Sequence, residues 1–283
     1  INYNGVGSVF AVNDQVSVTD RILTYNTGDE DFIISDGEFA LSTTVDSDGG
    51  PSVSFSSPTG SLTINTMVGD DTLTFTDLSL DFDADLNING GTVEFIRDLD
   101  FNSGDLNLDV DSVEISAALS TTGNVNIQAT YEIQMLASSF VGSIDAGAGD
   151  INLTGGWIQL RSLSTTGNVS LTANTTAIYD SNGSSVNITA DQIVLRSVTG
   201  SEGLEINANK LSYAIAGMEW GGQNPTPRDA KQRGREMLGG KREGKARKKK
   251  EEEGQGPKRT CLTPGHPCTA PERYTPGTGT CSG

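Results

Sequence analysis

Short triplets of apolar, polar and apolar residues recur along the middle of the chain, each entered from Asp, Asn, Gly or Ser. One longer phrase, Leu119–Val125, is repeated letter for letter as Leu163–Val169. The triplets begin 20, 19, 26, 18, 17 and 18 residues apart. A recurring step of this size predicts an all-β solenoid built from stacked repeats. The seven triplets are Leu86–Ile88, Leu106–Leu108, Val125–Ile127, Ile151–Leu153, Val169–Leu171, Val186–Ile188 and Leu204–Ile206.

Side chains alternate between the two sides of a strand, so the outer residues of each triplet should be buried and the middle one should face water. We expect two or three short strands per coil, with successive coils paired at roughly 4.8 Å. An antiparallel sandwich is the alternative, because it also has short strands at close spacing. The verbatim repeat favours the solenoid. Further apolar patches of the same kind are Val113–Ile115, Ile133–Met135, Ile158–Leu160 and Ile193–Leu195, with third patches at Leu119, Leu163 and Val198.

Residues 1–80 are also rich in strand patterns but less regular. The phrases Gly28–Ile34 and Gly69–Phe75 both place glycine and acidic residues just before an alternating strand. We expect 1–80 to form the first irregular coils or a capping segment of the same solenoid, with a separate small β-domain left open. The regular repeats then occupy 81–217, and 218–283 form a tail of different composition.

The acidic turns in these two phrases are the best candidates for chemistry in residues 1–217. Calcium binds several oxygen ligands, and adjacent Asp side chains on a glycine-bent loop supply them. The match to the calcium-binding repeat is partial, however, and Asp and Gly are also ordinary turn residues. We therefore assign no metal ligand, and calcium stays a weak alternative. The run Asp77–Asp85 alternates acidic and apolar residues and is expected to be a solvated strand face.

Charge is divided sharply along the 283 residues. Of 37 acidic and 19 basic residues, 30 acidic and five basic ones lie in the first 220, which therefore carry a net charge of about −25. Nucleic acids and anionic membranes should be repelled by so acidic a surface. The sequence contains no apolar run of membrane-spanning length. It begins with Ile rather than Met, so we expect a processed product or a fragment whose export signal lies upstream.

Enzymatic residues are not evident before the tail. A polysaccharide lyase needs a base and cations, whereas these residues hold no His and five scattered basic side chains. Arg161 and Arg196 occur in matching phrases and are expected to stack in a row, more as a repeat position than as a site. Since Asp is abundant, a carboxylate pair suited to hydrolysis would occur by chance. We predict a protein without enzymatic activity, with no catalytic, cofactor-binding or metal-binding residue. Glycosylation sequons, which chance alone would produce, occur at Asn152, Asn168, Asn174, Asn182 and Asn187.

The tail, 218–283, should be disordered, because it is rich in Pro, Gly and charge and cannot bury a core. Three interpretations stay open. The basic run Lys241–Glu253 would serve as an interaction arm, or four residues of this tail would bind zinc, although their spacing fits no standard site. A frameshift or misjoined gene model is favoured over both, because the composition changes abruptly in mid-repeat. The four potential zinc ligands are Cys261, His266, Cys268 and Cys281.

The segments 168–173 and 150–154, together with the repeated phrase, resemble the filamentous-haemagglutinin type of repeat found in large bacterial surface proteins. The segment 69–74 resembles the acidic repeats of other such proteins. The first resemblance implies a right-handed parallel β-helix that is secreted and forms a fibre outside the cell or on its surface. It implies an adhesin-like or structural role, with a glycan or surface protein as partner. A polysaccharide lyase or hydrolase is the alternative function, and calcium-stabilised surface-layer material is a third.

Overall fold

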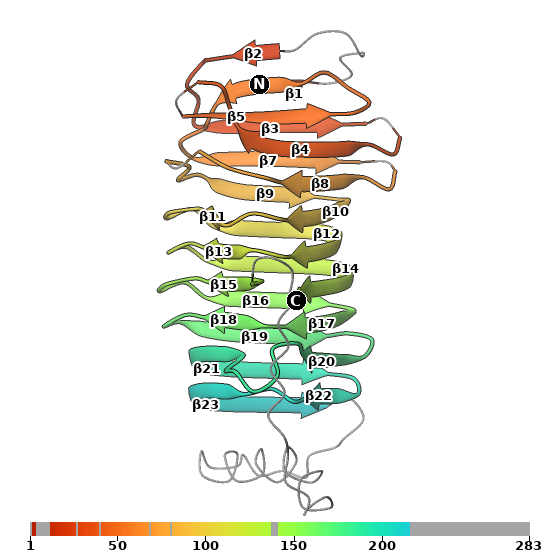
Figure 1. The fold of residues 1–283 in the computed structure, drawn as a ribbon, viewed down its shortest axis with the longest axis vertical. Helices are drawn as coiled ribbons and strands as arrows, with labels where there is room; N and C mark the ends of the chain where they lie inside the picture. Colours follow the sequence, from red (N-terminus) through yellow and green to blue (C-terminus); the bar gives the residue numbers. More distant parts are fainter. Residues whose placement is uncertain are drawn as a thin grey trace, which may run out of the picture. The chain divides into compact units, whose positions relative to one another are not determined.

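In a computed structural model, the structure describes residues 2–3, 12–26, 28–39, 41–67, 69–79, 81–136 and 141–215. All of them belong to the compact unit Ile1–Leu238. The described residues form 23 strands and no helix, and these strands make one continuous, mostly parallel sheet (Figure 1). The predicted all-β class is confirmed. The antiparallel sandwich is wrong for this part of the chain, and the predicted tail at 218–283 lies outside the described residues.

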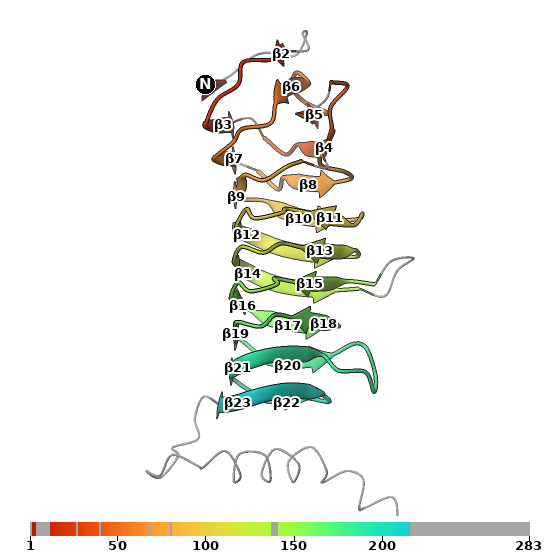
Figure 2. The same cartoon turned by 90° about the vertical axis from the view of Figure 1, so that its left-hand side faces the viewer.

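Twenty of the 23 described strands are arranged in three stacks, within which each strand pairs in parallel with strands of the next repeat. One passage of the chain through the three stacks is termed a layer. The first stack runs along one side of the sheet (Figure 2). It consists of β1 (Asn2–Tyr3), β3 (Asp20–Tyr25), β7 (Ser61–Thr66), β9 (Asp85–Asn89), β12 (Leu106–Ile115), β14 (Val125–Met135), β16 (Ile151–Gly155), β19 (Asn168–Ala173), β21 (Ile188–Ser197) and β23 (Ile206–Ile215).

From β9 onward, each layer passes through the second and third stacks after the first. Strands β12 and β14 are long enough to continue from the first stack into the second. The other members of the second stack are β4 (Asp31–Asp36), β8 (Thr72–Phe75), β10 (Thr92–Phe95), β17 (Trp157–Leu160), β20 (Ala177–Asp180) and β22 (Gly200–Glu202). The third stack contains β11 (Leu99–Asp100), β13 (Ala118–Ser120), β15 (Ser143–Asp145), β18 (Ser162–Ser164) and the first residues of β21 and β23.

The core is a set of apolar columns that run through the layers. The first residues of the first five predicted triplets lie in register and are at most 1% exposed. In the second stack, Phe75 lies over Phe95 with ring centroids 5.0 Å apart. Burying one such side chain stabilises the fold by about 1.5–3 kcal/mol relative to leaving it in water. The predicted inward-facing positions are thus confirmed for these five triplets.

The last two predicted triplets belong to a different stack from the one the spacing suggested. Ile188 pairs with Leu163 in the third stack, and Ile206 pairs with Ile188. Val186 is 49% exposed, whereas Asn187 is fully buried, which reverses the predicted pattern. The Asn187 amide donates to the Asp180 carboxylate at 2.9 Å, so this buried polar group is satisfied.

The corresponding error affects the patch at Ile193–Leu195. It was grouped with the second patch of each repeat, but it pairs with Val169–Leu171 in the first stack. Val198, expected in a third patch, lies outside any strand and is 37% exposed. The physical reason is that a triplet determines which side chains of its strand face the core. It does not determine to which of the three stacks the strand belongs. The segment between β20 and β21 shifts every later triplet by one stack.

The described part of 1–80 contains both parallel and antiparallel pairs. Strands β3 and β7 pair in parallel, as do β4 and β8, each at a spacing of 41 residues. Strand β5 (Ser42–Ser47) pairs antiparallel with β4 and with β6 (Val53–Ser56), and β6 also pairs with β2 (Val12–Asp14). Arg21 is fully buried here, with its guanidinium 2.8 Å from the Asp14 carboxylate and 4.7 Å from the centre of the Phe55 ring.

The phrase that occurs twice makes the same contacts in both copies. The Thr121 hydroxyl donates to the Gly104 carbonyl oxygen at 2.6 Å, and the Thr165 hydroxyl donates to the Gly149 carbonyl oxygen at 2.5 Å. In each copy the glycine two residues later donates its N–H to the threonine oxygen. The repeated letters therefore encode a repeated turn that rests on the layer before it.

Glycine at position 149 is required by the close approach of successive layers. A β-carbon there would lie 1.8 Å from the Gly123 carbonyl oxygen, whereas one at Gly28 would meet nothing within 4 Å. We expect Gly149→Ala to lower the free energy of unfolding by about 1–3 kcal/mol, the usual range for overpacking. Gly28→Ala is the matched control and should be close to neutral. Urea denaturation followed by circular dichroism checks this, and equal midpoints for the two variants would contradict it.

Candidate functional site

The outward surface of the first stack carries polar residues in three columns. We name the outward side chains of β9, the first half of β12, the first half of β14, β16 and β19 the amide face. Alternate residues of these strands point into the core, which leaves every second side chain on the surface. The columns are Asp85, Asp105, Asn124, Asp150 and Asn168; Asn87, Asn107, Asn126, Asn152 and Ser170; and Asn89, Asp109, Gln128, Thr154 and Thr172.

The central column is a chain of side-chain amides joined by hydrogen bonds. Asn107 donates to the Oδ1 of Asn87 at 3.1 Å, Asn126 donates to Asn107 at 2.9 Å, and Asn152 donates to Asn126 at 3.0 Å. An asparagine amide has two N–H donors and an oxygen with two lone pairs. Within the column, the amides of Asn107 and Asn126 each use one N–H donor and one oxygen lone pair. Each therefore keeps one N–H donor and one lone pair for a partner outside the protein.

The first column uses its carboxylates to hold the next layer. The Asp105 N–H donates to Asp85 at 2.9 Å, and the Asn124 N–H donates to Asp105 at 2.6 Å. Asp150 in turn accepts the backbone and side-chain N–H groups of Asn168 at 2.7 and 3.0 Å. Asn side chains between Asp residues supply donors where two adjacent carboxylates would repel each other. The column is therefore part of the fold as well as of the surface.

An open depression of about 250 Å³ lies over the central and third columns. It is lined by residues of four successive layers, so its polar groups repeat at the roughly 4.8 Å spacing of paired strands. The carbon atoms of Leu108 and Ile127 add apolar surface between them. In the third column, Gln128 donates to Asp109 at 3.2 Å. The depression can form hydrogen bonds with a polar, uncharged chain that lies along the stack.

The two predicted acidic phrases are brought together, one layer above the other. The Asp70 N–H donates to the Asp29 carboxylate, and the Glu30 N–H donates to the Asp71 carboxylate, both at 3.0 Å. Backbone N–H groups thus occupy oxygens that the calcium hypothesis would give to a cation. In the ranges that the structure describes, no three His, Cys, Asp or Glu side chains are grouped so as to hold a metal ion.

Asp71 is 4% exposed and lies beside other acidic residues. Burial raises the pKa of its carboxyl, and the negative charges of Glu30 and Asp29 raise it further, against the lowering effect of the hydrogen bond from the Glu30 N–H. Burial and the charge of Glu30 also raise the pKa of the Tyr25 hydroxyl. The Tyr25 hydroxyl therefore stays protonated, and ionisation of Asp71 makes the stability of this end of the sheet depend on pH.

The acidic run at 77–85 was predicted to be a strand face, and this is correct only at its end. Leu78 and Phe82 are buried as expected, but β9 begins at Asp85 and the described residues before it form no strand. The Asp77 carboxylate accepts the Leu78 N–H at 2.9 Å, which favours a turn. Hydrogen bonds from Ser103 to Asp83 lower the pKa of that exposed carboxyl.

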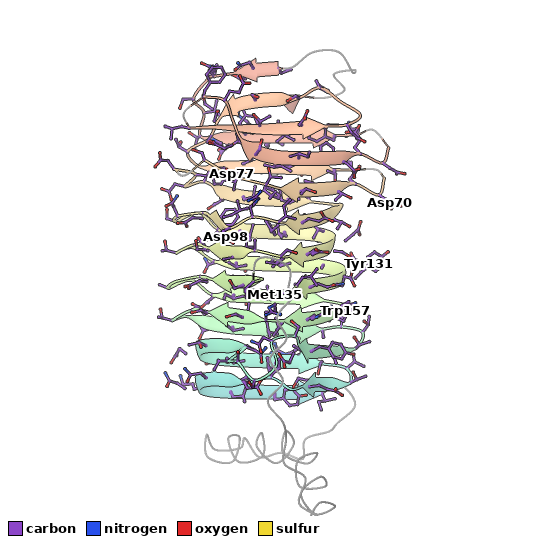
Figure 3. All side chains as sticks on the ribbon, in the orientation of Figure 1. Asp70, Asp77, Asp98, Tyr131, Met135 and Trp157 are labelled. Carbon is purple, nitrogen blue, oxygen red and sulfur yellow. The ribbon has the colours of Figure 1, made fainter. Side chains whose placement is uncertain are left out.

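A second cleft, of about 710 Å³, was not predicted. It is lined by three carboxylates from successive layers, Asp36, Asp77 and Asp98, together with Arg97. Asp77 and Asp98 lie one above the other in Figure 3. The 41 residues between Asp36 and Asp77 match the register of β4 with β8, and Asp98 lies one residue past the 20-residue step from β8 to β10. That signal was present in the sequence, but it could be recognised only after the layer lengths were known.

Arg161 and Arg196 do not form the predicted row. The Arg161 guanidinium, between β17 and β18, donates to the Ser181 carbonyl oxygen at 2.9 Å. Arg196 lies in register with Thr172 in the first stack. The matching phrases around the two arginines occur in different stacks, so similar local sequence did not place them on one surface.

The sequons fall in unlike surroundings. Asn187 is buried and hydrogen-bonded, so it is closed to modification in the folded protein. Asn152 and Asn168 belong to columns of the amide face, and Asn174 is exposed beyond the end of β19. The predicted basic arm and zinc ligands, between 241 and 281, lie outside the described residues.

Comparison of the chain with protein-family models, with curated proteins and with solved structures finds no match. Among the residues that the structure describes, no helix is long and apolar enough to cross a membrane.

Asp71→Asn should stabilise the protein at neutral pH. Because folding raises the pKa of Asp71, its contribution to stability is fully present below the unfolded-state pKa of about 3.9 and declines as pH rises through the folded-state value. An asparagine oxygen still accepts the Glu30 N–H but never ionises. We expect a melting temperature above that of the wild type at pH 7, with the difference vanishing near pH 3.

Asp46→Asn, at an exposed position of β5, is the control for the change in net charge. Thermal melts monitored by circular dichroism from pH 3 to pH 8 provide the measurement. The interpretation of Asp71 would be wrong if both variants showed the same pH dependence relative to the wild type.

Proposed function

We propose that the chain is part of a right-handed parallel β-helix. Two features support this proposal. The chain visits the first, second and third stacks in the same order in successive layers, and each stack is paired in parallel across those layers. A repeat winding in this manner satisfies its own backbone hydrogen bonds only when stacked on its neighbours. An experimental structure of the chain checks the hand of the winding.

On this scaffold, the chain acts as a secreted or cell-surface repeat protein without enzymatic activity, adhesin-like in contacting glycans or structural within a fibre. The observation that carries the proposal is the hydrogen-bonded amide column from Asn87 to Asn152. It holds unused donors and acceptors at a fixed spacing. Such a row complements a ligand whose hydroxyl groups also repeat at regular intervals.

The charge of the protein narrows the class of glycan. The first 220 residues carry a net charge of about −25, so the protein would repel an anionic polysaccharide. The amide face itself carries Asp side chains among its amides, and these accept hydrogen bonds from hydroxyl groups. Uncharged polysaccharides are therefore the favoured partners. A surface protein that offers a similar polar strand is the other partner class considered.

The double variant Asn107→Ala and Asn126→Ala tests this role directly. It removes the two inner members of the amide column. The amides that remain at Asn87 and Asn152 then form hydrogen bonds with water instead. We expect binding to uncharged polysaccharides to weaken about tenfold or more, which corresponds to losing two or more hydrogen bonds of ordinary net strength. Affinity electrophoresis through gels containing soluble β-glucan, mannan or xylan provides the measurement, with alginate as the anionic comparison.

Asn207→Ala with Asn209→Ala is the matched control, because these exposed amides lie in β23, beyond the last strand of the amide face. Thermal melts of both double variants separate loss of binding from loss of folding. Retention by alginate alone, or equal retention of the two folded variants, would contradict the proposal.

A carbohydrate-active enzyme is the second candidate, and one observation favours it. The cleft lined by Asp36, Asp77 and Asp98 brings carboxylates from three layers to one open surface beside Arg97. Glycoside hydrolysis ordinarily uses two carboxyl groups, one to protonate the leaving oxygen and one to activate water or attack the sugar. A polysaccharide lyase acting on a uronate-containing chain would instead use Arg97, either as a cation that neutralises the uronate carboxylate or as the base.

We expect the wild-type protein to release no new reducing ends from the uncharged polysaccharides above, or from alginate and pectin as uronate substrates. Asp77→Asn is the variant that decides the alternative, because this residue is the middle carboxylate of the cleft. Release of reducing ends by the wild type that is lost in Asp77→Asn, and kept in the control Asp46→Asn, would establish the enzyme and overturn the non-enzymatic proposal.

A further inference from the structure

Three aromatic side chains lie near the surface of successive layers beside the amide face. Tyr131 in β14 is 63% exposed and Tyr179 in β20 is 38% exposed, with Trp157 of β17 half-buried between their layers. We name these three residues the aromatic corner. Tyr131 and Trp157 project from the same edge in Figure 3. The other large aromatic residues near these layers, such as Phe95 and Phe101, are buried in the core.

A β-bulge directs Tyr131 outward. Val110 pairs with Ala129 and Ser112 pairs with Glu132, so β14 has two residues where β12 has one. The extra residue of a bulge bends its strand and re-aims the neighbouring side chain. Bulges are concentrated near functional sites because they break the regular alternation. Here the break exposes the Tyr131 ring to water, although burial of the ring in the core would have been more favourable.

The next layer packs closely against the backbone of the bulge. Its residues opposite the bulge are Gly155 and Gly156, and a β-carbon at Gly156 would lie 2.3 Å from the Tyr131 carbonyl oxygen. No side chain therefore stands between Thr154 on the amide face and Trp157. The indole of Trp157 is held edge-on against the Tyr179 ring, with ring centroids 6.2 Å apart and an interplanar angle of 77°. The corner is thus partly pre-organised.

The aromatic corner adjoins the depression of the amide face. Gln128 and Thr154 line that depression, and Tyr131 and Trp157 follow them by three residues in the same two layers. Binding sites typically combine aromatic surface with a few polar groups that fix orientation. The aromatic corner supplies the aromatic surface, and the amide face supplies the polar groups. Hydrogen-bonding amides lie on one side of the bend and flat apolar rings lie on the other.

We propose that the aromatic corner is a stacking subsite for pyranose rings, selecting uncharged β-linked glucose-type chains. In such sugars the hydroxyl groups are equatorial, so both faces of the ring present C–H groups that pack against an aromatic face. The hydroxyl edges remain free to reach amide donors and acceptors. Three layers of stacked strands span roughly 10 Å, which accommodates more than one sugar ring. This inference rests on the glycan-binding function proposed above.

Tyr131→Ala and Tyr131→Phe, in the full chain, test the proposal. Tyr131 is exposed, so neither change should alter folding, and Tyr131→Phe keeps the ring while removing the hydroxyl. Titration calorimetry with cellohexaose and with mannohexaose is the measurement. We expect Tyr131→Ala to weaken cellohexaose binding about tenfold, as removal of an aromatic anchor commonly does, and Tyr131→Phe to stay within about twofold of the wild type. Phe39→Ala, at another exposed aromatic residue, should have no effect.

The outcomes separate the two proposals. If the wild type binds cellohexaose and Tyr131→Ala binds it equally well, the stacking subsite is wrong and the amide face stands. If the wild type binds neither oligosaccharide nor any of the polysaccharides, both proposals are wrong. Equal affinity for cellohexaose and mannohexaose would overturn the predicted selectivity. Dimerisation of the wild type that is lost in Tyr131→Ala, measured by light scattering, would assign the corner to a second copy of the chain instead.

Discussion

Parallel pairing in register is the constraint on which the rest of this structure depends. It places each residue directly over its counterpart in the next layer, at roughly 4.8 Å. On the core side of the sheet this favours apolar columns, because an apolar side chain packs well on the apolar side chain of the next layer. On the outside the same rule would set carboxylate against carboxylate. The amide face avoids this where Asp105, Asn124, Asp150 and Asn168 alternate acid with amide along one column.

The acidity of the chain is partly explained by the same constraint. Carboxylates at turns accept N–H groups of the following layer, as Asp29 does for Asp70 and Asp83 does for Ser103. These acids therefore hold layers together through hydrogen bonds. A buried acid such as Asp71 incurs a cost for ionising, and this links the stability of that end of the sheet to pH.

The regular parts of the surface and the irregular ones suit different tasks. The amide column offers the same pair of hydrogen-bonding groups in every layer, which favours binding along a repetitive ligand but gives little selectivity. Selectivity needs a feature that occurs once. The bulge at Tyr131 and the glycines beneath it provide such a feature, and so does the acidic cleft around Asp77. Both depend on departures from the repeat.

The sequence by itself determined the all-β class and which side of each strand in the first five triplets faces inward, because alternation with a period of two depends only on neighbouring residues. It also indicated the polar surface positions of those triplets. The stack to which a triplet belongs was decided only in three dimensions, since triplets such as Val169–Leu171 and Val186–Ile188 look alike. Their placement depends on the lengths of the segments between them. For the same reason the cleft of Asp36, Asp77 and Asp98 could not be foreseen. Pairing between layers brings Asp77 beside Asp36, 41 positions earlier, and places Asp98 one residue past the 20-residue step of the next pair of layers.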